Sequence, residues 1–308
     1  MVAERVWITE VGPRDGLQNQ PQSLSVEQRI CLIDSLIAAG LNHIEMGSFV
    51  SPNAVPAMAK SDEVMAGLVG RSAKFSALVP NRRGYDNAHQ AGVPAVNLVV
   101  AASNTFNLKN INRSTEQVLA ACAEIIACGR ADGIDVVPYV ATAWECPFEG
   151  GMDSGKVLAL FNRLIDFGAS RVVLADTIGA ATPAQVTVLT KQAIALHGEE
   201  AIACHFHDTR GFAGANAFAA LEQGVRRFDS SVGGLGGCPF APGATGNVAT
   251  EDLVLLFEQM GFSTGINLDR LLETIELVKQ LTGNCSGGHS LAWLQRRQQR
   301  DNENKKAR

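Results

Sequence analysis

Two histidines separated by a single residue are the first feature of this sequence that could perform chemistry. Segment 205–208 reads HFHD and ends an apolar run that begins at Ile202. Because residues two apart on a β-strand point to the same face, His205 and His207 would project together. A metal ion would take both imidazoles as neutral ligands; the alternative is a hydrogen-bonded pair of polar histidines. Since the chain has only six histidines, the pairing favours the metal site.

A second candidate is the adjacent pair Arg14 and Asp15, which follows a strand-like run and is bounded by glycine and proline. Taken alone, this pair is better explained as a surface salt bridge. Its position directly after a strand is what makes it a candidate for a functional site.

A third candidate is segment 231–247, which contains six glycines and two prolines and holds Cys238 between Gly237 and Pro239. Glycine permits unusual φ values and a close approach of the backbone to a ligand. A flexible linker is the alternative, but linkers rarely hold a cysteine in this setting or lead straight into an apolar helix. We therefore predict a lid or binding loop with a thiol at its tip. Asn247 and Glu251 follow, four residues apart on one face of the next helix.

Other catalytic and nucleotide-binding motifs are incomplete. Segment 150–157 (GGMDSGKV) matches most of a P-loop, but Val157 replaces the Ser or Thr that would hold magnesium. The glycines at 233–237 do not fit G-x-G-x-x-G, and no G-x-S-x-G elbow is present. The sequence therefore argues against a P-loop site, a dinucleotide-binding fold and an α/β-hydrolase.

The elements that must position the candidate residues are short β-branched runs that alternate with longer amphipathic stretches. Strands are predicted at 6–11, 43–47, 75–79, 96–100, 134–140, 172–175, 202–206 and 227–231. Helices are predicted at 26–39, 116–129, 156–167, 183–196 and 213–223, with Ser25 as N-cap of the first. Gly40, Gly92 and Gly168 are expected to end helices in the left-handed conformation.

Eight strands alternating with helices predict parallel βαβ units, arranged as a TIM (β/α)8 barrel or, as the competitor, an open doubly wound sheet. In a barrel, the carboxyl ends of all strands converge on one mouth, where the active sites of this fold lie. The candidates found at or just after strand ends are Asp15, Glu45, Asp176, His205, His207 and Cys238. Their convergence on one mouth favours the barrel.

Composition narrows the classes of function and the number of domains. Of 308 residues, 46% are hydrophobic, which supports a sizeable core, and a net charge of −5 gives no electrostatic footprint for nucleic acid. No signal peptide is visible, and no apolar run reaches the roughly 18 residues of a membrane span. Seven scattered cysteines without C-x-x-C fit reduced thiols in the cytoplasm. We predict one barrel domain over 1–294 and a polar, disordered tail over 295–308.

Several segments resemble the 3-hydroxy-3-methylglutaryl-CoA (HMG-CoA) lyase family. Segments 11–19 (VGPRDGLQN) and 231–240 (SVGGLGGCPF) look like its two signatures. Segments 44–52 (IEMGSFVSP), 175–179 (ADTIG) and 246–252 (GNVATED) are similar to its other blocks. The resemblance covers nearly the whole chain, and the cysteine-containing loop is its most specific part, because the wider metallolyase superfamily shares the Arg-Asp and H-x-H pairs.

The resemblance implies a TIM barrel that binds a divalent cation, Mg²⁺ or Mn²⁺, and cleaves an acyl-CoA into acetyl-CoA and acetoacetate. By matching position, the metal ligands would be Asp15, His205, His207 and Asn247. Arg14 would stabilise an enolate and Cys238 would act as acid and base on a mobile loop, while Asp176 and Glu45 would support chemistry or orient the substrate. Further substrate contacts are expected from Ser48, Thr177 and Arg210.

The same resemblance implies an acyl-CoA as the partner molecule, without nucleic acid or membrane, in a cytoplasmic homo-oligomer with a dimer favoured. The residue types agree with the chemistry. A divalent ion lowers the pKa of the substrate hydroxyl, a guanidinium stabilises the enolate oxygen, and a thiol returns a proton to carbon. One carboxylate, two imidazoles and one amide oxygen suit Mg²⁺ or Mn²⁺ better than a structural zinc.

Three positions depart from the family's pattern. Arg210 replaces a usual tyrosine, Asn104 stands where glutamate is common, and Ala175 replaces a glycine. Arg210 would bind a substrate carboxylate or CoA phosphate, or pair structurally with an acid such as Asp208. An HMG-CoA lyase is the leading hypothesis, and a lyase for a different 3-hydroxyacyl-CoA is the alternative. A Claisen-condensing synthase and a non-catalytic barrel that binds CoA esters are less favoured.

Overall fold

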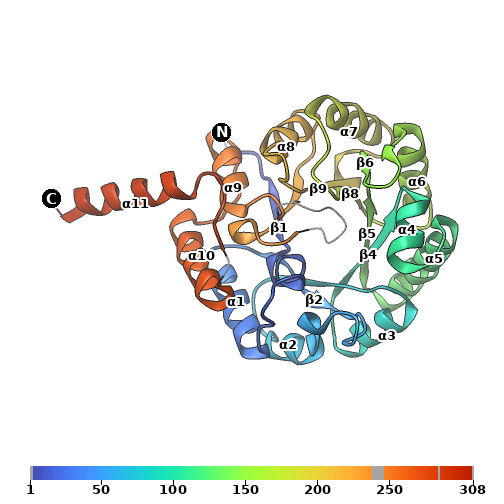
Figure 1. Cartoon of the computed structure of the whole chain (residues 1–308), viewed down its shortest axis with the longest axis horizontal. Coiled ribbons are helices and arrows are strands. Elements are labelled where there is room, and N and C mark those ends of the chain that lie inside the picture. Colours follow the sequence, from blue (N-terminus) through green and yellow to red (C-terminus); the bar gives the residue numbers. More distant parts are fainter. Residues whose placement is uncertain (1–2, 238–245, 284, 307–308) are drawn as a thin grey trace.

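The computed structural model describes residues 3–237, 246–283 and 285–306 and shows a closed barrel of eight parallel strands surrounded by helices (Figure 1). Around the barrel the strands follow the order β1, β10, β9, β8, β5, β4, β3, β2. Their bounds are β1 (Trp7–Glu10), β2 (His43–Ser48), β3 (Lys74–Leu78), β4 (Ala95–Ala101), β5 (Asp135–Ala141), β8 (Val172–Asp176), β9 (Ile202–Phe206) and β10 (Arg227–Ser230). The predicted TIM barrel is confirmed, and the open doubly wound sheet is wrong.

Helices form the outer layer, which covers the barrel wall on all sides (Figure 1). They are α1 (Val26–Ala38), α2 (Ser61–Gly67), α3 (Arg82–Gln90), α4 (Asn104–Ile111), α5 (Thr115–Asp132), α6 (Ser154–Asp166), α7 (Pro183–His197), α8 (Ala213–Glu222), α9 (Thr250–Gln259), α10 (Leu268–Thr282) and α11 (Leu291–Lys306). Within the described ranges, no helix combines the length and apolar character needed to cross a membrane.

Local sequence signals fix the ends of these helices. Ser25 accepts a hydrogen bond from the backbone of Gln28, whose side chain bonds back to Ser25, so the predicted N-cap of α1 forms a full capping box. At the other end, Gly40 has a φ of 100°, a left-handed conformation that an L side chain rarely adopts. A Cβ there would also lie 2.5 Å from the carbonyl oxygen of Gly265. Glycine is therefore required where α1 turns into β2.

The alternation of side chains along β9 decides which residues enter the barrel. Phe206 is buried in the layer between strands and helices, where its ring lies 5.6 Å from that of Trp144. Its neighbours His205 and His207 must then point to the opposite face, into the barrel. Burial of one aromatic ring thus directs two imidazoles toward the mouth.

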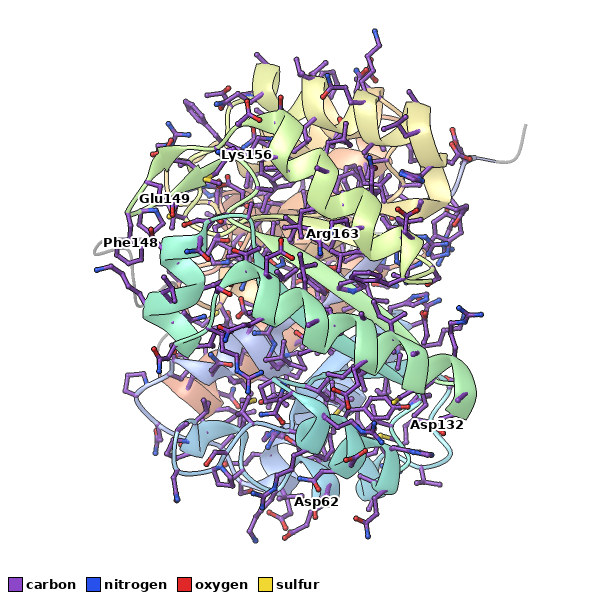
Figure 2. The ribbon with its side chains drawn as sticks, turned by 90° about the vertical axis from the view of Figure 1, so that its right-hand side faces the viewer. Asp62, Asp132, Phe148, Glu149, Lys156 and Arg163 are labelled. Carbon is purple, nitrogen blue, oxygen red and sulfur yellow. The ribbon has the colours of Figure 1, made fainter. Side chains whose placement is uncertain are left out.

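A short hairpin outside the barrel joins β6 (Glu145–Cys146) to β7 (Gly150–Gly151). Glu149 in its turn accepts a hydrogen bond of 2.8 Å from the backbone N–H of Thr105 at the start of α4. Figure 2 shows Phe148 and Glu149 at one end of the molecule and Asp132, where α5 ends, at the other. The hairpin follows the carboxyl end of β5 and lies at the mouth end of the barrel. Strands of two residues give no pattern that a sequence could reveal.

The polar C-terminal segment is helical where a disordered tail over 295–308 is expected. Helix α11 runs to Lys306 and extends away from the barrel (Figure 1). Leu294 is fully buried, whereas the residues that follow are mostly exposed. The segment is rich in Gln, Arg, Glu and Lys, which are good helix formers, so a polar composition does not by itself exclude a helix. The expectation of disorder up to Lys306 is therefore wrong.

We predict that Gly129→Ala destabilises the protein by about 1–3 kcal/mol, against the usual gain from replacing glycine in a helix. A Cβ at Gly129 would clash with the side chain of Val136 and lie 2.8 Å from the carbonyl oxygen of Ile134. The matched control is Gly155→Ala in α6, where the one neighbour is a carboxylate oxygen of Asp153 at 3.2 Å. Urea unfolding measures both free energies. Equal or higher stability of Gly129→Ala would show that α5 does not pack this closely on β5.

Candidate active site and metal centre

The first part of the site is a π-helical turn that follows β1, from Gly12 to Gly16. The backbone N–H groups of Arg14 and Asp15 both donate to the carbonyl of Val11, at 3.1 and 2.7 Å. Such turns are rare and occur frequently at functional sites. A Cβ on Gly16 would lie 2.9 Å from the side chains of Ser231 and Leu235, so glycine lets this turn contact the segment after β10. The two segments that carry the family resemblance are therefore in contact.

Three side chains at the mouth form a candidate metal site. The carboxylate of Asp15 and one ring nitrogen each of His205 and His207 lie within 4.8 Å of one another. The two imidazole rings are 5.2 Å apart, and both residues are buried. The sequence prediction that these histidines share one face is confirmed.

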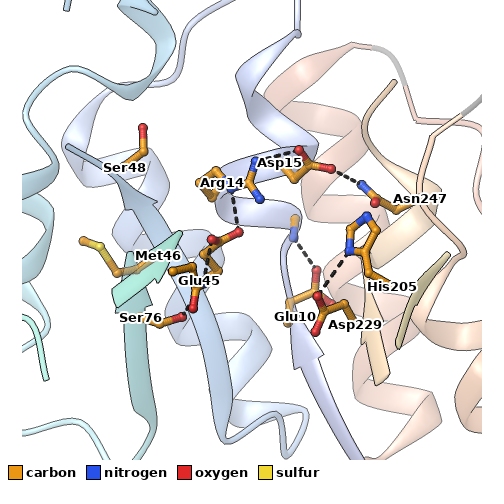
Figure 3. A network of polar contacts seen from close by, with 12 residues as sticks. Glu10, Arg14, Asp15, Glu45, Met46, Ser48, Ser76, His205, Asp229 and Asn247 are labelled. Carbon is orange, nitrogen blue, oxygen red and sulfur yellow. Dashed lines mark hydrogen bonds and ion pairs between the residues drawn. The ribbon is translucent and has the colours of Figure 1, made fainter. Parts of the chain in front are cut away.

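His205 is oriented from below by Asp229 of β10. Its Nδ1 lies 3.2 Å from Oδ2 of Asp229, which leaves Nε2 as the nitrogen for a metal (Figure 3). Burial lowers the pKa of His205, but the hydrogen bond and charge of Asp229 outweigh burial and raise it. Carboxylates that orient ligand histidines in this way fix the ring and strengthen its basicity.

Asn247 joins the site because the chain returns to β9 after the glycine-rich loop. The backbone N–H of Val248 donates to the carbonyl of Phe206, and that of Asp208 to Gly246, at 3.0 and 3.1 Å. Nδ2 of Asn247 donates to Asp15 at 2.8 Å (Figure 3). It also donates to the carbonyl of Leu235 at 2.9 Å. Both donors of the amide are used, which leaves its oxygen free.

The donor set fits a hard divalent cation. Oδ1 of Asn247 and Nδ1 of His207 are buried without a hydrogen-bond partner, and an unsatisfied buried polar atom is costly. Burial, and then the neighbouring His205, lower the pKa of His207 to about 4, so its ring is neutral as a ligand must be. Burial alone would raise the pKa of Asp15, but the charge of Arg14, with the neighbouring imidazoles and the hydrogen bond from Asn247, holds it well below its usual range. The site therefore offers an anionic oxygen, neutral nitrogens and an amide oxygen.

Arg14 connects this cluster to β2. Its Nε donates to Glu45 at 2.5 Å and its Nη1 to Asp15 at 2.6 Å (Figure 3). The other oxygen of Glu45 accepts a bond of 2.7 Å from Asn97 of β4. Burial lowers the pKa of Arg14, but the charges of Glu45 and Asp15 more than offset it, so the guanidinium stays charged. Within the described residues, Nη2 of Arg14 has no partner.

Asp176 and Thr177, at the end of β8, are engaged in local hydrogen bonds. The two carboxylate oxygens of Asp176 accept from the backbone N–H groups of Ala180 and Ala181, at 2.8 and 3.0 Å. Burial raises the pKa of Asp176 to about 6 even though these bonds oppose it. Oγ1 of Thr177 accepts a bond of 2.7 Å from the backbone of Thr142. Both residues lie at the mouth, and their side-chain oxygens bind the backbone of the loops that follow β8 and β5.

Arg210 lies against the same loop. Its Nε and Nη2 donate to the carbonyls of Gly179 and Ala181, each at 3.0 Å. The alternative of an ion pair with Asp208 is wrong, because that carboxylate lies 2.8 Å from His289 instead. Its role toward a substrate stays a prediction.

Ser48 ends β2 and is buried, with a hydroxyl that lacks a partner in the described chain. Its backbone N–H donates to Oγ of Ser61 at 3.2 Å, and Arg29 donates to the same hydroxyl. The predicted acid–base residue Cys238 lies outside the described residues.

Glu10 and Glu251 are two buried carboxylates that were not among the predicted site residues, and both hold the start of the glycine-rich segment 231–247. Oε1 of Glu10 accepts from the backbone N–H groups of Gly12 and Val232, at 2.8 and 2.9 Å, and Oε2 accepts from Thr250 at 2.6 Å. Glu251 accepts from the backbone of Gly233 at 3.1 Å. Burial raises the pKa of each to about 7. They tie the π-helical turn, the start of the loop and α9 together.

Some of the site residues that were not predicted carry a signal in the sequence, and others carry none. Asn97 lies between two apolar residues of β4, which predicts that it faces the barrel interior, whereas Asp229 is followed by two serines and lacks that signal. Glu10 lies four residues before Arg14, and Glu251 was noted only for its spacing from Asn247. Nothing in the sequence shows that their partners are backbone N–H groups.

Fold and site together define a class, the TIM barrels with a candidate metal site at the carboxyl ends of the strands. The HMGL-like family model matches residues 5–278, and the chain belongs to that family. It is 45% identical to a hydroxymethylglutaryl-CoA lyase of Pseudomonas mevalonii over 271 residues, 88% of this chain and 90% of that protein. The resemblance stated from the sequence is thereby confirmed.

Two further comparisons frame the choice of substrate. An (R)-citramalyl-CoA lyase of Chloroflexus aurantiacus is 41% identical over 291 residues, which cover 91% of this chain and 92% of that protein. The crystal structure of a hydroxymethylglutaryl-CoA lyase from Pseudomonas aeruginosa superposes with a TM-score of 0.92 at 39% identity, covering 96% of this chain and all of that one. The chain is therefore similar over its barrel to lyases that are named for two different acyl-CoA substrates, HMG-CoA and citramalyl-CoA.

We predict that Asp229→Asn weakens Mn²⁺ binding about 10–100-fold, because an amide orients His205 without raising the basicity of its ring. Electron paramagnetic resonance of free Mn²⁺ measures the dissociation constant. Asp135→Asn, at the opposite end of the barrel interior, is the matched control and should leave the constant unchanged. Equal affinities for wild type and Asp229→Asn would remove Asp229 from the metal site.

We predict that folding stability falls between pH 4.5 and 7, and that Glu10→Gln flattens this fall. The folded-state pKa of Glu10 is raised to about 7 from 4.5, so the folded state holds a proton that the unfolded state has released. Its stabilising contribution is full below pH 4.5 and is lost as pH rises through 7, a change of about 1–3 kcal/mol. Glutamine mimics the protonated acid and does not titrate.

Urea unfolding at pH 5 and pH 7.5 measures this difference in wild type and Glu10→Gln. The exposed Glu63→Gln on α2 is the control and should keep the pH dependence of the wild type. An unaltered pH dependence in Glu10→Gln would mean that Glu10 is ionised throughout this range.

Proposed function

We propose that the protein cleaves HMG-CoA into acetyl-CoA and acetoacetate. The observation that carries this proposal is the buried guanidinium of Arg14 directly beside a cluster of metal-binding donors, in a chain of the HMGL-like family. In this reaction the 3-hydroxyl loses a proton, the C2–C3 bond breaks, and its electron pair becomes the enolate of acetyl-CoA. The C3 fragment leaves as acetoacetate, and protonation of the enolate carbon gives acetyl-CoA.

Asp15, His205, His207 and Asn247 would hold the divalent ion, which we propose is Mg²⁺ or Mn²⁺. When bound, the ion lowers the pKa of the substrate hydroxyl and orients the substrate oxygens. Asp229 keeps His205 in the tautomer that presents Nε2. Low pKa values at Asp15 and His207 mean that neither ligand has to lose a proton at neutral pH.

Arg14 is placed to stabilise negative charge on the thioester oxygen. Glu45 and Asp15 hold two edges of the guanidinium, and the Nη2 group is left for the substrate. A preorganised donor of this kind is typically worth about 3–4 kcal/mol of transition-state stabilisation. Glu45 acts as a positioning residue, because it touches Arg14 and Asn97 rather than the reacting atoms.

Cys238 is the group we propose for returning the proton to the enolate carbon, since its thiol follows the loop segment that Glu10 and Glu251 hold at Val232 and Gly233. Ser48, Thr177 and Arg210 are proposed substrate contacts around the mouth, and Asp176 is proposed to orient the substrate. The acyl-CoA substrate is supported by the relatives. A cytoplasmic homodimer remains our expectation for the assembly, and light scattering after size exclusion tests it.

A lyase for a different 3-hydroxyacyl-CoA is the second candidate. It is favoured by the similarity to the citramalyl-CoA lyase and by Arg210, whose guanidinium replaces the phenol usual for the family. Citramalyl-CoA and HMG-CoA both carry a tertiary hydroxyl and a carboxylate, so the same ligand set and Arg14 would serve either substrate.

Acetoacetate release from HMG-CoA tests the proposal, with citramalyl-CoA in parallel and with Mg²⁺ or Mn²⁺ supplied. We expect metal-dependent formation of acetoacetate and acetyl-CoA in equal amounts and a higher kcat/KM for HMG-CoA. Pyruvate formation from citramalyl-CoA at the higher kcat/KM would establish the second candidate instead. Turnover of neither substrate would contradict both.

We predict that Cys238→Ala lowers kcat about 10²–10⁴-fold with little change in KM, because a proton donor acts in the transition state rather than in substrate binding. The control is Cys204→Ala, which replaces a fully buried thiol on β9 whose pKa burial raises well above its usual range, so that it stays protonated and inert. A loss of kcat in Cys204→Ala as large as that in Cys238→Ala would contradict the assignment of the thiol.

A further inference from the structure

A second cavity opens at the opposite end of the barrel from the metal site. It has a volume of about 230 Å³ and is lined by inward-facing residues at the amino-terminal ends of the strands, among them Trp7, His43, Lys74 and Arg227. In most TIM barrels this space is filled by layers of branched side chains. The residues of the HMGL-like site described above do not include any of these four, and we call this cavity the amino-terminal pore.

The pore exists because several of the inward-facing side chains beyond the rim are small. Thr9, Ser76, Ala95, Val173 and Ala203 line it. Thr9 and Ser76 are only half-buried although they lie inside strands of a closed barrel. Solvent and small solutes can therefore reach past the rim.

The rim carries an excess of positive charge. Lys74, Arg171 and Arg227 come from three different strands or strand starts and all line the pore, against one rim carboxylate, Asp135. Arg227 forms an ion pair with Glu200 at 2.7 Å, and Arg171 forms a longer one with Asp135 at 3.8 Å. In the described part of the chain, Lys74 has no acidic partner.

The positive charge at the rim helps to keep the ring of His43 neutral. Burial lowers the pKa of His43 to about 4, and the charges of Lys74, Arg227 and Arg171 all act in the same direction. Three cations, Lys74, Arg171 and Arg227, thus face one opening beside two carboxylates, Asp135 on the rim and Glu200 next to it, and the neutral ring of His43 adds no negative charge. Such a concentration of positive potential over a recess with low-dielectric walls attracts anions.

The floor of the pore sets how deep an anion can go. Asp229 and Tyr139 line its inner end, and Asp229 is the carboxylate that orients His205. Because a second negative charge next to Asp229 would be repelled, an anion is held at the rim, among the cations and close to the ring of Trp7. Arg227 lies over that ring, with its guanidinium carbon 4.5 Å from the ring centroid.

We infer that the amino-terminal pore is a binding site for a small multivalent oxyanion of the phosphate class. Among the described residues Lys74 is the rim cation without an acidic partner, and Arg171 and Arg227 contribute charge while they remain paired with Asp135 and Glu200. This site is independent of the proposed lyase function, since it lies at the other end of the barrel and shares no ligand with the metal.

Isothermal titration of the Mg²⁺-loaded protein with inorganic phosphate, at constant ionic strength and with coenzyme A present, tests the inference. Coenzyme A is included to occupy the phosphate-binding surface that the proposed acyl-CoA substrate would use at the mouth, so that binding at the amino-terminal pore is measured separately. We expect one saturable site per chain, and an increase of at least tenfold in the dissociation constant for Lys74→Gln and for Arg171→Gln.

Lys191→Gln, an exposed lysine of α7 that does not line the pore, is the matched control and should bind phosphate like the wild type. Lyase activity and circular dichroism of the pore variants should equal those of the wild type, which separates a lost site from a lost fold. The inference is overturned if binding is not saturable, if the pore variants bind as the control does, or if coenzyme A abolishes binding.

Discussion

Arg14 keeps a full positive charge in a place that is almost closed to water, and carboxylates on two of its edges make this possible. Removing such a charge from solvent is expensive unless the geometry of its partners is good. Glu45 and Asp15 supply that geometry, and Asp15 is at the same time the carboxylate of the metal cluster. One guanidinium thus keeps Asp15 ionised and fixes its orientation, so the electrostatics of the metal site begin at Arg14.

The closed barrel provides the supports that this ion pair needs. Strand β2 lies next to β1, so Glu45 faces the turn that carries Arg14, and β4 adds Asn97 behind it. On the other side β9 and β10 are neighbours, which sets Asp229 under His205. Because the strands are parallel, all of these side chains meet at one end of the barrel, and the helices around it keep water from the barrel wall.

Much of this arrangement could be predicted from the sequence, and what could not has a physical reason. Strand periodicity placed His205 and His207 on one face, and the spacing of strands predicted the barrel. Both faces of a parallel strand are buried, so the hydrophobic pattern does not separate the barrel interior from the helix-facing side, and the role of Asp229 could not be predicted. The segment of α11 is polar like a disordered tail, although its residues favour a helix.

The central claim is that Asp15, His205, His207 and Asn247 hold one divalent ion at the mouth of the barrel. Anomalous diffraction from crystals grown with Mn²⁺ tests it most directly, because the signal identifies the element and its position together. The account predicts a single strong anomalous peak in contact with all four side chains, and its loss in crystals of Asp15→Asn. A barrel mouth without a peak under saturating Mn²⁺, or a peak held by other residues, would contradict the account.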